Sequence, residues 1–177
     1  GDPRLSSCFS EATSRTAAGE ILEIAAQGRV DTSAEQYEEM VRGKTAWLIR
    51  AACEMGALAA GADVAAVAAA ATYGENLGMA FQMVDDALDF DPESATGKPT
   101  GGDVREGKLT PPLRLYRESL NEADRKDFDA AFTSLSMTEA DAEAIALRIR
   151  EAGFDAAVRA QADTFLDAAR RALGSLP

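Results

Sequence analysis

The sequence predicts an all-α fold, an antiparallel helical bundle, and three observations support this prediction. Apolar residues recur at the three- and four-residue spacing of α-helices, and no segment sustains the alternation of a half-buried strand. Apolar residues make up 46% of the chain but aromatic residues only 6%, which favours closely packed helices. Short connections rich in glycine, proline and capping residues separate the periodic stretches. Helices joined by short connections pack as antiparallel neighbours. We expect residues 1–177 to form a single all-helical domain.

Two helices are predicted before residue 61. The first covers residues 7–27 and ends at Gly28, a residue type that commonly terminates helices. Thr32 and Glu35 have the spacing of a capping box, which predicts the start of the second helix, and Gly61 marks its end. The second helix carries an apolar stripe: Tyr37, Val41, Leu48, Ala52 and Met55.

The third predicted helix covers residues 65–89, and its apolar side chains keep helical spacing: Leu77, Phe81, Val84 and Leu88. Gly74 and Gly78 lie one turn apart in this helix, so a neighbouring helix can approach closely there. Residues 90–110 show no apolar period, and we expect a loop.

Four helices are predicted after this loop. Pro111–Pro112 suits the first turn of one helix, and Asn121 caps the next. Ser136 and Glu139 have capping-box spacing and predict the start of a third. The last helix is expected over residues 154–173.

Charge and composition exclude several functions. The net charge of −12 argues against a nucleic-acid partner, whose phosphates would be repelled. The absence of histidine excludes histidine-dependent triads and zinc sites with histidine ligands. Cys8 and Cys53 lack metal-site spacing and are interpreted as buried, reduced thiols. We see no signal peptide, and the alanine-rich run of residues 56–71 is too short and weakly apolar to cross a bilayer. We therefore expect a cytoplasmic protein without stable membrane insertion.

An acidic face ends the third predicted helix: Gln82, Asp85, Asp86 and Asp89. At 3.6 residues per turn, Asp85 and Asp89 lie about 40° apart around the axis, so both carboxylates can hold one ligand. Carboxylates this close repel each other, and a divalent cation relieves the repulsion. The alternative is a solvated helix end, which does not explain the lysine-bearing motifs that accompany the acidic face.

A glycine-rich segment, residues 97–112, follows the acidic face and carries Lys98 and Lys108. Such a segment suits anionic oxygens. Mg²⁺ prefers one or two carboxylates together with substrate phosphates. The acidic face and the lysines together predict a diphosphate held through Mg²⁺.

Lys44 lies on the apolar stripe of the second helix, between Val41 and Leu48. It is either an edge residue that extends its amine to solvent or a ligand for an anion. Counting residues from the turns places Glu20, Lys44 and the 82–89 face within about 5–10 Å of one level of the bundle. For Glu20 the alternative is a solvated face, and the same holds for Glu23.

Residues 81–112 resemble the second aspartate-rich motif and the following loop of the trans-polyprenyl diphosphate synthases. The matching pattern is FQ-x-x-DD-x-x-D, then GK-x-x-G-x-D-x-x-x-GK-x-T-x-P. The similarity continues upstream to Lys44–Thr45 and Gly19–Glu20, and more faintly to the C-terminus. The resemblance implies a bundle of the isoprenoid synthase type. It also implies isoprenoid biosynthesis, in which isopentenyl diphosphate is condensed with an allylic prenyl diphosphate.

The resemblance also implies roles for single residues. It implies three metal ligands for Mg²⁺: Asp85, Asp86 and Asp89. It implies three ligands for the substrate diphosphate: Lys44, Lys98 and Lys108. It implies four catalytic residues: Lys44, Thr45, Gln82 and Lys98. Thr45 and Gln82 are then expected near the carbocation, and Asp103 is expected to shape the loop. Because the family is dimeric, we expect a homodimer through the helices before Lys44.

The sequence lacks two motifs of the family. The family carries a first aspartate-rich motif and an upstream Gly-Lys-x-x-Arg motif, and neither occurs between Gly1 and Phe81. The chain thus resembles the C-terminal half of a synthase, incomplete at the N-terminus, and we expect it to be inactive by itself. Two alternatives stay open, a non-catalytic partner subunit of a synthase and a related terpene synthase.

Overall fold

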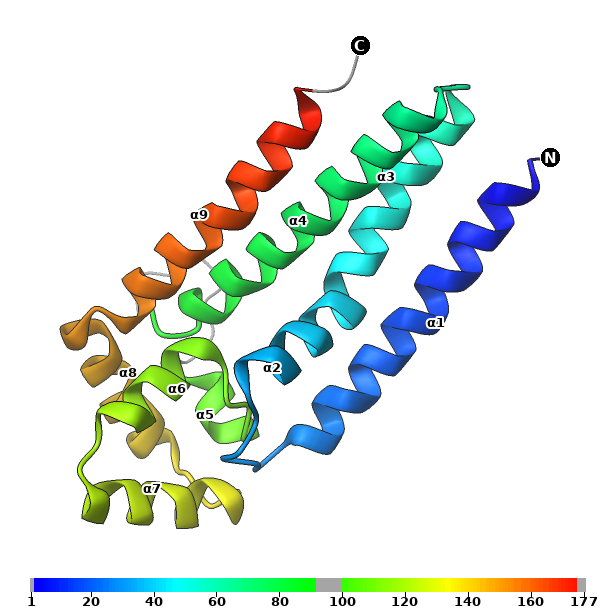
Figure 1. Cartoon of the computed structure of the whole chain (residues 1–177). Helices are drawn as coiled ribbons and strands as arrows, with labels where there is room; N and C mark the ends of the chain where they lie inside the picture. Colours follow the sequence, from blue (N-terminus) through cyan, green and yellow to red (C-terminus); the bar gives the residue numbers. More distant parts are fainter. Residues whose placement is uncertain (1, 92–99, 175–177) are drawn as a thin grey trace. The chain divides into compact units, whose positions relative to one another are not determined.

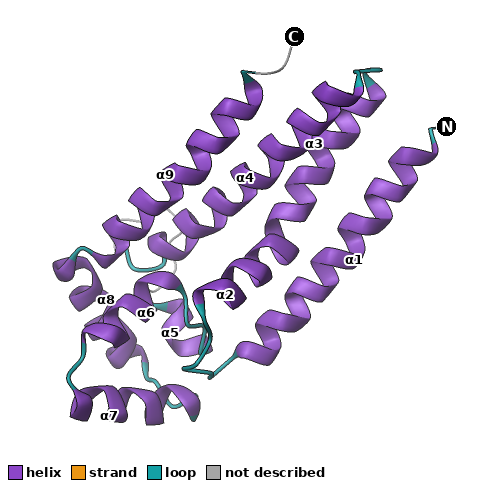
Figure 2. Ribbon diagram, in the orientation of Figure 1, coloured by secondary structure: helices purple, strands orange, loops and turns teal. Residues whose placement is uncertain are grey.

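The computed structural model describes residues 2–91 and 100–174, and its regular elements are helices (Figures 1 and 2). No strand occurs in these two ranges, which confirms the all-α prediction. Lys98, a predicted diphosphate ligand, lies outside the described residues. Within them, no helix combines the length and hydropathy needed to cross a membrane.

The elements follow one another in this order: α1 (Pro3–Ala26), α2 (Ala34–Val41), the π-helical turn η1 (Arg42–Ala46), α3 (Trp47–Ala59), α4 (Val64–Leu88), α5 (Gly102–Glu106), α6 (Pro111–Ser119), α7 (Glu122–Thr133), α8 (Glu139–Ala152) and α9 (Phe154–Leu173). Most boundaries agree closely with the predicted ones. Two elements were not predicted, the turn η1 inside the second predicted helix and the short helix α5 inside the predicted loop.

The capping box of α2 lies one residue later than predicted. Ser33 and Gln36 form it, because the Gln36 N–H donates to Ser33 Oγ at 3.2 Å and the Ser33 N–H donates to Gln36 Oε1 at 2.8 Å. The prediction of Thr32 and Glu35 was wrong. Adjacent hydroxyl residues give two overlapping patterns, and a glutamine closes the box as well as a glutamate does.

The capping box of α8 also differs from the predicted one. Thr138 accepts from the Asp141 N–H at 3.2 Å, and Asp141 accepts from the Thr138 N–H at 2.9 Å. The predicted pair of Ser136 and Glu139 was wrong. The hydroxyl of Ser136 instead donates to Ala131 O at 3.3 Å, at the end of α7.

The helices group into two compact units. The first consists of Gly1–Leu22, Glu38–Gln82 and Ala162–Pro177, and the second of Glu23–Tyr37 and Met83–Gln161. The single-domain organisation stays a prediction.

Close contacts between helix backbones characterise the first unit. A Cβ added at Gly74 would lie 2.7 Å from Ile49 O, and one at Gly78 would lie 2.5 Å from the Cα of Ala46. This confirms the predicted close approach at the two glycines.

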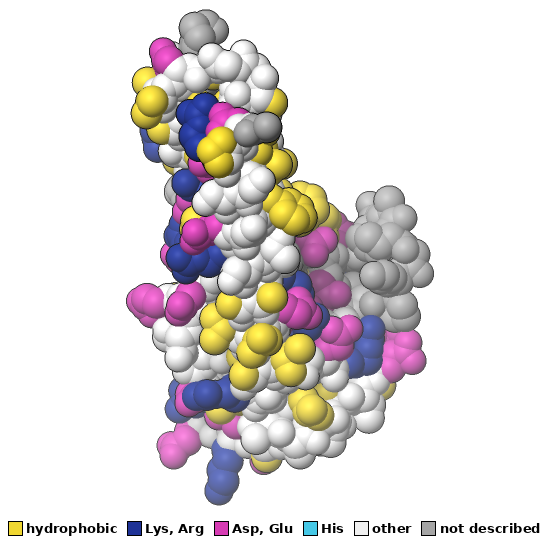
Figure 3. Space-filling view, turned by 90° about the vertical axis from the view of Figure 1, so that its right-hand side faces the viewer, with side chains coloured by type: hydrophobic (Ala, Val, Ile, Leu, Met, Phe, Trp, Pro, Cys, Tyr) yellow, Lys and Arg dark blue, Asp and Glu magenta, His cyan; other side chains and the backbone are white. Residues whose placement is uncertain are grey.

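Helix α1 carries large exposed apolar residues, with Phe9 61% and Ile21 66% exposed. Figure 3 shows hydrophobic side chains gathered on the face that lies to the right in Figure 1.

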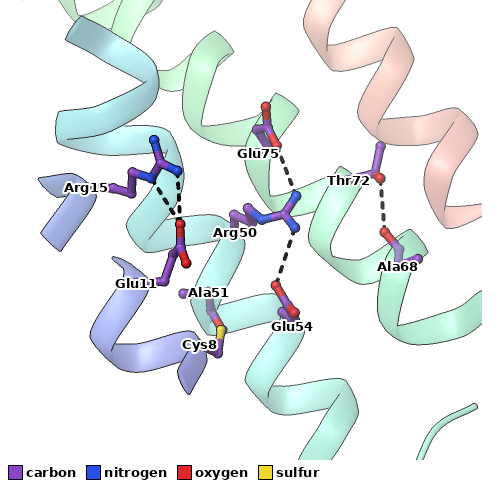
Figure 4. A network of polar contacts seen from close by, with 9 residues as sticks. All are labelled: Cys8, Glu11, Arg15, Arg50, Ala51, Glu54, Ala68, Thr72 and Glu75. Atoms are coloured by element: carbon purple, nitrogen blue, oxygen red, sulfur yellow. Dashed lines mark hydrogen bonds and ion pairs between the residues drawn. The ribbon is translucent and has the colours of Figure 1, made fainter. Parts of the chain in front are cut away.

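A polar network joins α3 to α4 in the first unit (Figure 4). Arg50 forms ion pairs with Glu75 at 3.1 Å and with Glu54 at 3.6 Å.

Both cysteines are free thiols and half-buried, and the Cys8 thiol donates to Ala51 O at 3.8 Å. The two thiols are less buried than expected, and the reduced state stays a prediction.

The second unit has a core of aromatic and aliphatic side chains: Phe90, Val104, Leu109, Leu113, Tyr116, Phe128, Phe132, Ala142, Ile145, Ala146 and Ile149. Phe128 stacks on Phe132 with ring centroids 5.4 Å apart and meets the edge of Tyr116 at 5.9 Å. Burying a large apolar side chain contributes about 1.5–3 kcal/mol, so this core fixes Phe90, which follows α4, and Val104 of α5 in place.

Candidate functional site

The π-helical turn η1 carries Lys44 and Thr45, two of the predicted catalytic residues. The sequence predicts an uninterrupted helix here, so the turn is a difference from the prediction. Such π-helical insertions are rare and occur frequently at functional sites. The local geometry therefore supports a functional role for the two residues.

Helix α1 contacts the backbone of this turn through Gly19. A Cβ added at Gly19 would lie 2.2 Å from the Lys44 N and 2.7 Å from the Gly43 C. A Cβ at Gly43 would in turn lie 3.0 Å from the Gly19 Cα. Only glycine allows this approach. The sequence analysis considered Glu20 but overlooked the packing role of Gly19. The signal available for this role was the presence of a glycine inside a predicted helix.

Glu20 and Lys44 form an ion pair at 3.4 Å, which confirms that they lie at one level. The Lys44 side chain is 30% exposed and that of Glu20 is 50% exposed. An exposed pair of this kind contributes about 0–1 kcal/mol, so an anionic ligand can compete with Glu20 for the ammonium group.

Thr45 and Gln82 contact each other directly. The Thr45 hydroxyl donates to Gln82 Oε1 at 2.9 Å, and this bond joins η1 to α4. The hydroxyl hydrogen is directed at Gln82, so the lone pairs of the Thr45 oxygen point elsewhere. The first unit thus brings together Glu20, Lys44, Thr45 and Gln82, as predicted.

The three aspartates at the end of α4 differ in exposure. Asp85 is exposed, Asp86 is buried and Asp89 is half-buried. Among the residues that the structure describes, no group of three His, Cys, Asp or Glu side chains is arranged to hold a metal ion. Mg²⁺ needs fewer protein ligands when phosphate oxygens complete its shell. The metal-binding role of the three aspartates stays a prediction.

Asp89 connects α4 to the short helix α5. Its two carboxylate oxygens accept from the Gly102 N–H at 3.0 Å and the Asp103 N–H at 2.9 Å. Burial nevertheless raises the pKa of Asp89, outweighing these hydrogen bonds. Asp89 thus fixes the start of α5, whose Val104 is 1% exposed in the core.

Asp103 is a buried carboxylate of the second unit. Its Oδ2 atom is buried and has no hydrogen-bond partner among the described residues. Burial and the charges of Asp86 and Asp89 raise its pKa well above the usual value, while Lys108 opposes this shift. A cation near this cluster would remove the repulsion, so the residues fit the predicted metal.

Lys108 ends the same short segment. It pairs with Glu23 at 3.3 Å and with Glu106 at 2.7 Å. Burial lowers the pKa of Lys108, but its hydrogen bond to Glu106 and the charge of Glu23 outweigh burial and raise it. Lys108 is therefore positively charged at neutral pH.

Tyr37 was not predicted to have a functional role, because it was interpreted as part of an apolar stripe. Its hydroxyl donates to Asp86 Oδ2 at 2.5 Å, and both residues are 6% exposed. A buried tyrosine usually finds a partner for its hydroxyl, and this requirement was the available signal.

Comparison with known proteins agrees with the resemblance of residues 81–112. Residues 1–148 match the protein family described as Polyprenyl synthetase. Component 2 of heptaprenyl diphosphate synthase from Geobacillus stearothermophilus is 36% identical over 189 residues, covering 100% of this chain and 54% of the relative. Geranylgeranyl diphosphate synthase from Mycobacterium tuberculosis is 36% identical over 149 residues, covering 83% of this chain and 42% of the relative.

Solved structures show the same fold. A decaprenyl diphosphate synthase from Rhodobacter capsulatus matches with a TM-score of 0.90 and 36% identity, covering 100% of this chain and 55% of that one. A polyprenyl synthase from Caulobacter crescentus CB15, complexed with calcium and isoprenyl diphosphate, matches with a TM-score of 0.91 and 36% identity. That match covers 98% of this chain and 53% of the other. The predicted fold type is confirmed, and the chain spans about half the length of these relatives.

Proposed function

Because this chain belongs to the polyprenyl synthetase family, we propose that it supplies the diphosphate-activating residues of a prenyltransferase in isoprenoid biosynthesis. The reaction is the condensation of isopentenyl diphosphate with an allylic prenyl diphosphate. The observation that carries the proposal is the acidic cluster of the second unit. Asp89 and Asp103 lie together there with raised pKa values, and Lys108 is close enough to oppose the shift at Asp103.

The residues divide into two roles in this proposal. Lys44, Lys98 and Lys108 bind the oxygens of the allylic diphosphate. Asp85, Asp86 and Asp89 would hold Mg²⁺, which would supply positive charge beside the leaving diphosphate. Thr45 and Gln82 stabilise the allylic carbocation. Their mutual hydrogen bond commits the Thr45 hydrogen to Gln82, so that the Thr45 oxygen can offer its lone pairs to positive charge.

The proposed order of events begins with ionisation of the allylic C–O bond, which releases diphosphate. The double bond of isopentenyl diphosphate then attacks the carbocation and forms the new C–C bond. Loss of a proton from the resulting cation restores a double bond.

Binding of farnesyl diphosphate to this chain tests the proposal. We expect Mg²⁺ to strengthen binding, and we expect Lys44→Ala to weaken it by about tenfold, the loss typical of one charge-assisted contact. Lys126→Ala is the matched control, because Lys126 is an exposed lysine on α7. Binding that ignores Mg²⁺, or that falls equally in both variants, would contradict the proposal.

A second candidate function is a partner subunit of a synthase. The observation in its favour is the relative from Geobacillus stearothermophilus, whose name describes one component of a synthase. Incubation of the pure chain with Mg²⁺, farnesyl diphosphate and labelled isopentenyl diphosphate is expected to give no elongated product, since the first aspartate-rich motif is absent from residues 1–81. The intact mass of the protein, compared with its open reading frame, distinguishes a partner subunit from a shortened enzyme.

We further propose that the protein forms a homodimer through α1. Phe9 and Ile21 support this, because a helix that exposes large apolar side chains is a typical interaction surface. Light scattering is expected to show a dimer and to show a monomer for Ile21→Lys. A wild-type monomer would exclude the proposal. The cytoplasmic location stays a prediction.

A further inference from the structure

Glu75 of α4 contacts the chain on both sides of the π-helical turn η1. Arg42, the first residue of η1, donates to Glu75 Oε1, and Arg50 of α3 donates to Glu75 Oε2 at 3.1 Å. Figure 4 shows the second of these contacts. The Glu75 side chain is 23% exposed, and water screens partly buried pairs less than surface pairs. One carboxylate of the first unit thus holds the segment before and after Lys44 and Thr45.

The π-helical turn brings Arg42 and Arg50 to the same carboxylate. An α-helix turns by about 100° per residue, so residues eight apart differ by about 80° around its axis. The Trp47 N–H bonds to Arg42 O, five residues earlier, so η1 holds one residue more than an α-helical turn. With that residue absorbed, the two arginines are related like residues seven apart, which differ by only about 20°. The double pairing of Glu75 therefore favours the π-helical form of this segment.

The form of the turn also sets the directions of Lys44 and Thr45. Both residues lie inside η1, and their side chains would leave the axis in other directions if the segment were α-helical. The hydrogen bond from Thr45 to Gln82 depends on the same register. The glycine contacts of α1 and α4 let the turn approach closely, but a glycine has no side chain with which to select its register. The ion pairs of Glu75 can do so.

We propose that Glu75 is a positioning residue of the diphosphate site: by pairing with Arg42 and Arg50 it keeps η1 π-helical and holds Lys44 and Thr45 in place for the substrate. This inference rests on the proposed function, in which Lys44 binds the allylic diphosphate. Glu75 acts through the turn, so its effect on substrate affinity requires Lys44.

Hydrogen exchange of the Trp47 amide tests the first part of the inference in the full chain, without a ligand. This N–H closes η1, and Trp47 is the single tryptophan of the sequence, so selective ¹⁵N labelling identifies its signal. Glu75→Gln keeps the shape of the side chain and removes its charge. It is expected to accelerate the exchange about fivefold, because two partly buried ion pairs are weakened. Wild-type exchange in Glu75→Gln overturns the inference.

Glu54→Gln is the matched control. Glu54 also pairs with Arg50, at 3.6 Å, and its side chain is 26% exposed, but it lies on the same helix as Arg50 and pairs with it across one turn. The exchange of Trp47 is expected to stay at the wild-type rate. An equal acceleration in Glu54→Gln and Glu75→Gln would overturn the inference, since pairing with Arg50 alone would then explain it.

Farnesyl diphosphate binding in the presence of Mg²⁺ tests the second part. Glu75→Gln is expected to weaken binding by about three- to tenfold in the wild-type chain and to cause no further loss in Lys44→Ala. Equal losses in both backgrounds, or no loss in the wild-type background, overturn the inference. A glutamate with a merely structural role would change stability and leave the affinity of the folded chain unaltered.

The two measurements separate the inference from the function on which it rests. A wild-type chain that does not bind farnesyl diphosphate, or normal binding by Lys44→Ala, overturns the proposed function and the role of Glu75 in substrate binding. The exchange of Trp47 still shows whether Glu75 holds the turn. If Glu75→Gln does not fold, Arg42→Gln replaces it, because it removes one of the two ion pairs from a side chain that is 40% exposed. The same changes are expected, and wild-type values overturn the inference.

Discussion

Thr45 and Gln82 are joined by a hydrogen bond of 2.9 Å, from the Thr45 hydroxyl to Gln82 Oε1, across η1 and α4 of the first unit. The bond fixes both side chains before any substrate binds. It makes the pair a single polar element on two helices, and substitution of either residue disturbs the other.

Thr45→Val is expected to lower the free energy of unfolding by about 1 kcal/mol, because it keeps the shape of the side chain and removes the hydroxyl donor to Gln82. Urea unfolding measures the change. Farnesyl diphosphate affinity should stay close to that of the wild type, since the pair is proposed to act on the carbocation. Unchanged stability would show that the hydrogen bond is absent in solution.

Gly19→Ala is expected to destabilise the protein by about 2–3 kcal/mol, the upper part of the range for overpacked sites. The new Cβ would lie 2.2 Å from the Lys44 N, and backbone cannot move aside as a side chain can. Gly56→Ala is the control, since no atom lies within 4 Å of its added Cβ. It should be neutral or stabilising by up to about 1 kcal/mol in thermal or urea unfolding. Equal effects at the two glycines would refute the close contact.

Asp85→Ala is expected to reduce Mg²⁺-dependent diphosphate binding by at least about tenfold while leaving stability unchanged or slightly raised. Asp85 is exposed, and its loss relieves repulsion among like charges at the end of α4. Calorimetric titration with magnesium diphosphate measures binding, and Asp127→Ala, an exposed aspartate on α7, is the control. Unfolding of Asp85→Ala with normal binding would make the cluster structural.

The stability of the metal-free protein is expected to fall with rising pH relative to that of Asp103→Asn. The pKa of Asp103 is raised in the folded state, so the native protein holds this proton more tightly than the unfolded chain does. The stabilisation that Asp103 gives through this proton is fully present below the pKa of the unfolded state. It is lost as the pH rises through the pKa of the folded state and does not change further above it.

Urea unfolding in EDTA from about pH 4.5 to 7.5 checks this expectation, because the range begins just above the usual aspartate pKa. Carboxylates with lowered pKa values, such as Asp31 and Asp141, contribute equally to both proteins and cancel in the difference. A difference that does not vary with pH would contradict the burial of Asp103.

Elements with local end signals could be predicted from the sequence. Asn121 caps α7 by accepting from the Asp124 N–H at 2.9 Å, as predicted. Pro111 begins α6, and Gly153 ends α8 with a φ of +73°. The convergence of Lys44 with Glu20 was also predictable, because it follows from counting residues along helices of fixed rise.

The short helix α5 could not be predicted in this way. Its five residues contain one buried apolar side chain, Val104, which gives no period to recognise. What starts the helix is Asp89, thirteen residues upstream of Gly102 in the sequence. The hydrogen bond of Tyr37 could not be predicted for the same reason, since its partner Asp86 is distant in sequence.

The apolar stripe of the second predicted helix was correct only as far as the turn η1. Tyr37 and Val41 are buried as expected, but Leu48 is 54% exposed. Ala51 and Leu58 are the buried residues of α3. The buried face of α3 therefore differs from the predicted stripe, and no pattern of residue types announces the π-helical turn that precedes it.

The additional residue in η1 decides how this region responds to changes in length. Removing one residue from Arg42–Ala46 would let the segment close as an ordinary α-helix, and because a π-helical turn differs from an α-helical turn by that one residue, α3 would keep its orientation. Trp47–Ala59 would still present the same face to Gly74 and Gly78. Removing a residue within α3 would instead turn everything after it by about 100°. Single-residue deletions are therefore expected to be better tolerated in Arg42–Ala46 than in Trp47–Ala59, and an alignment gap is better placed in the π-helical turn.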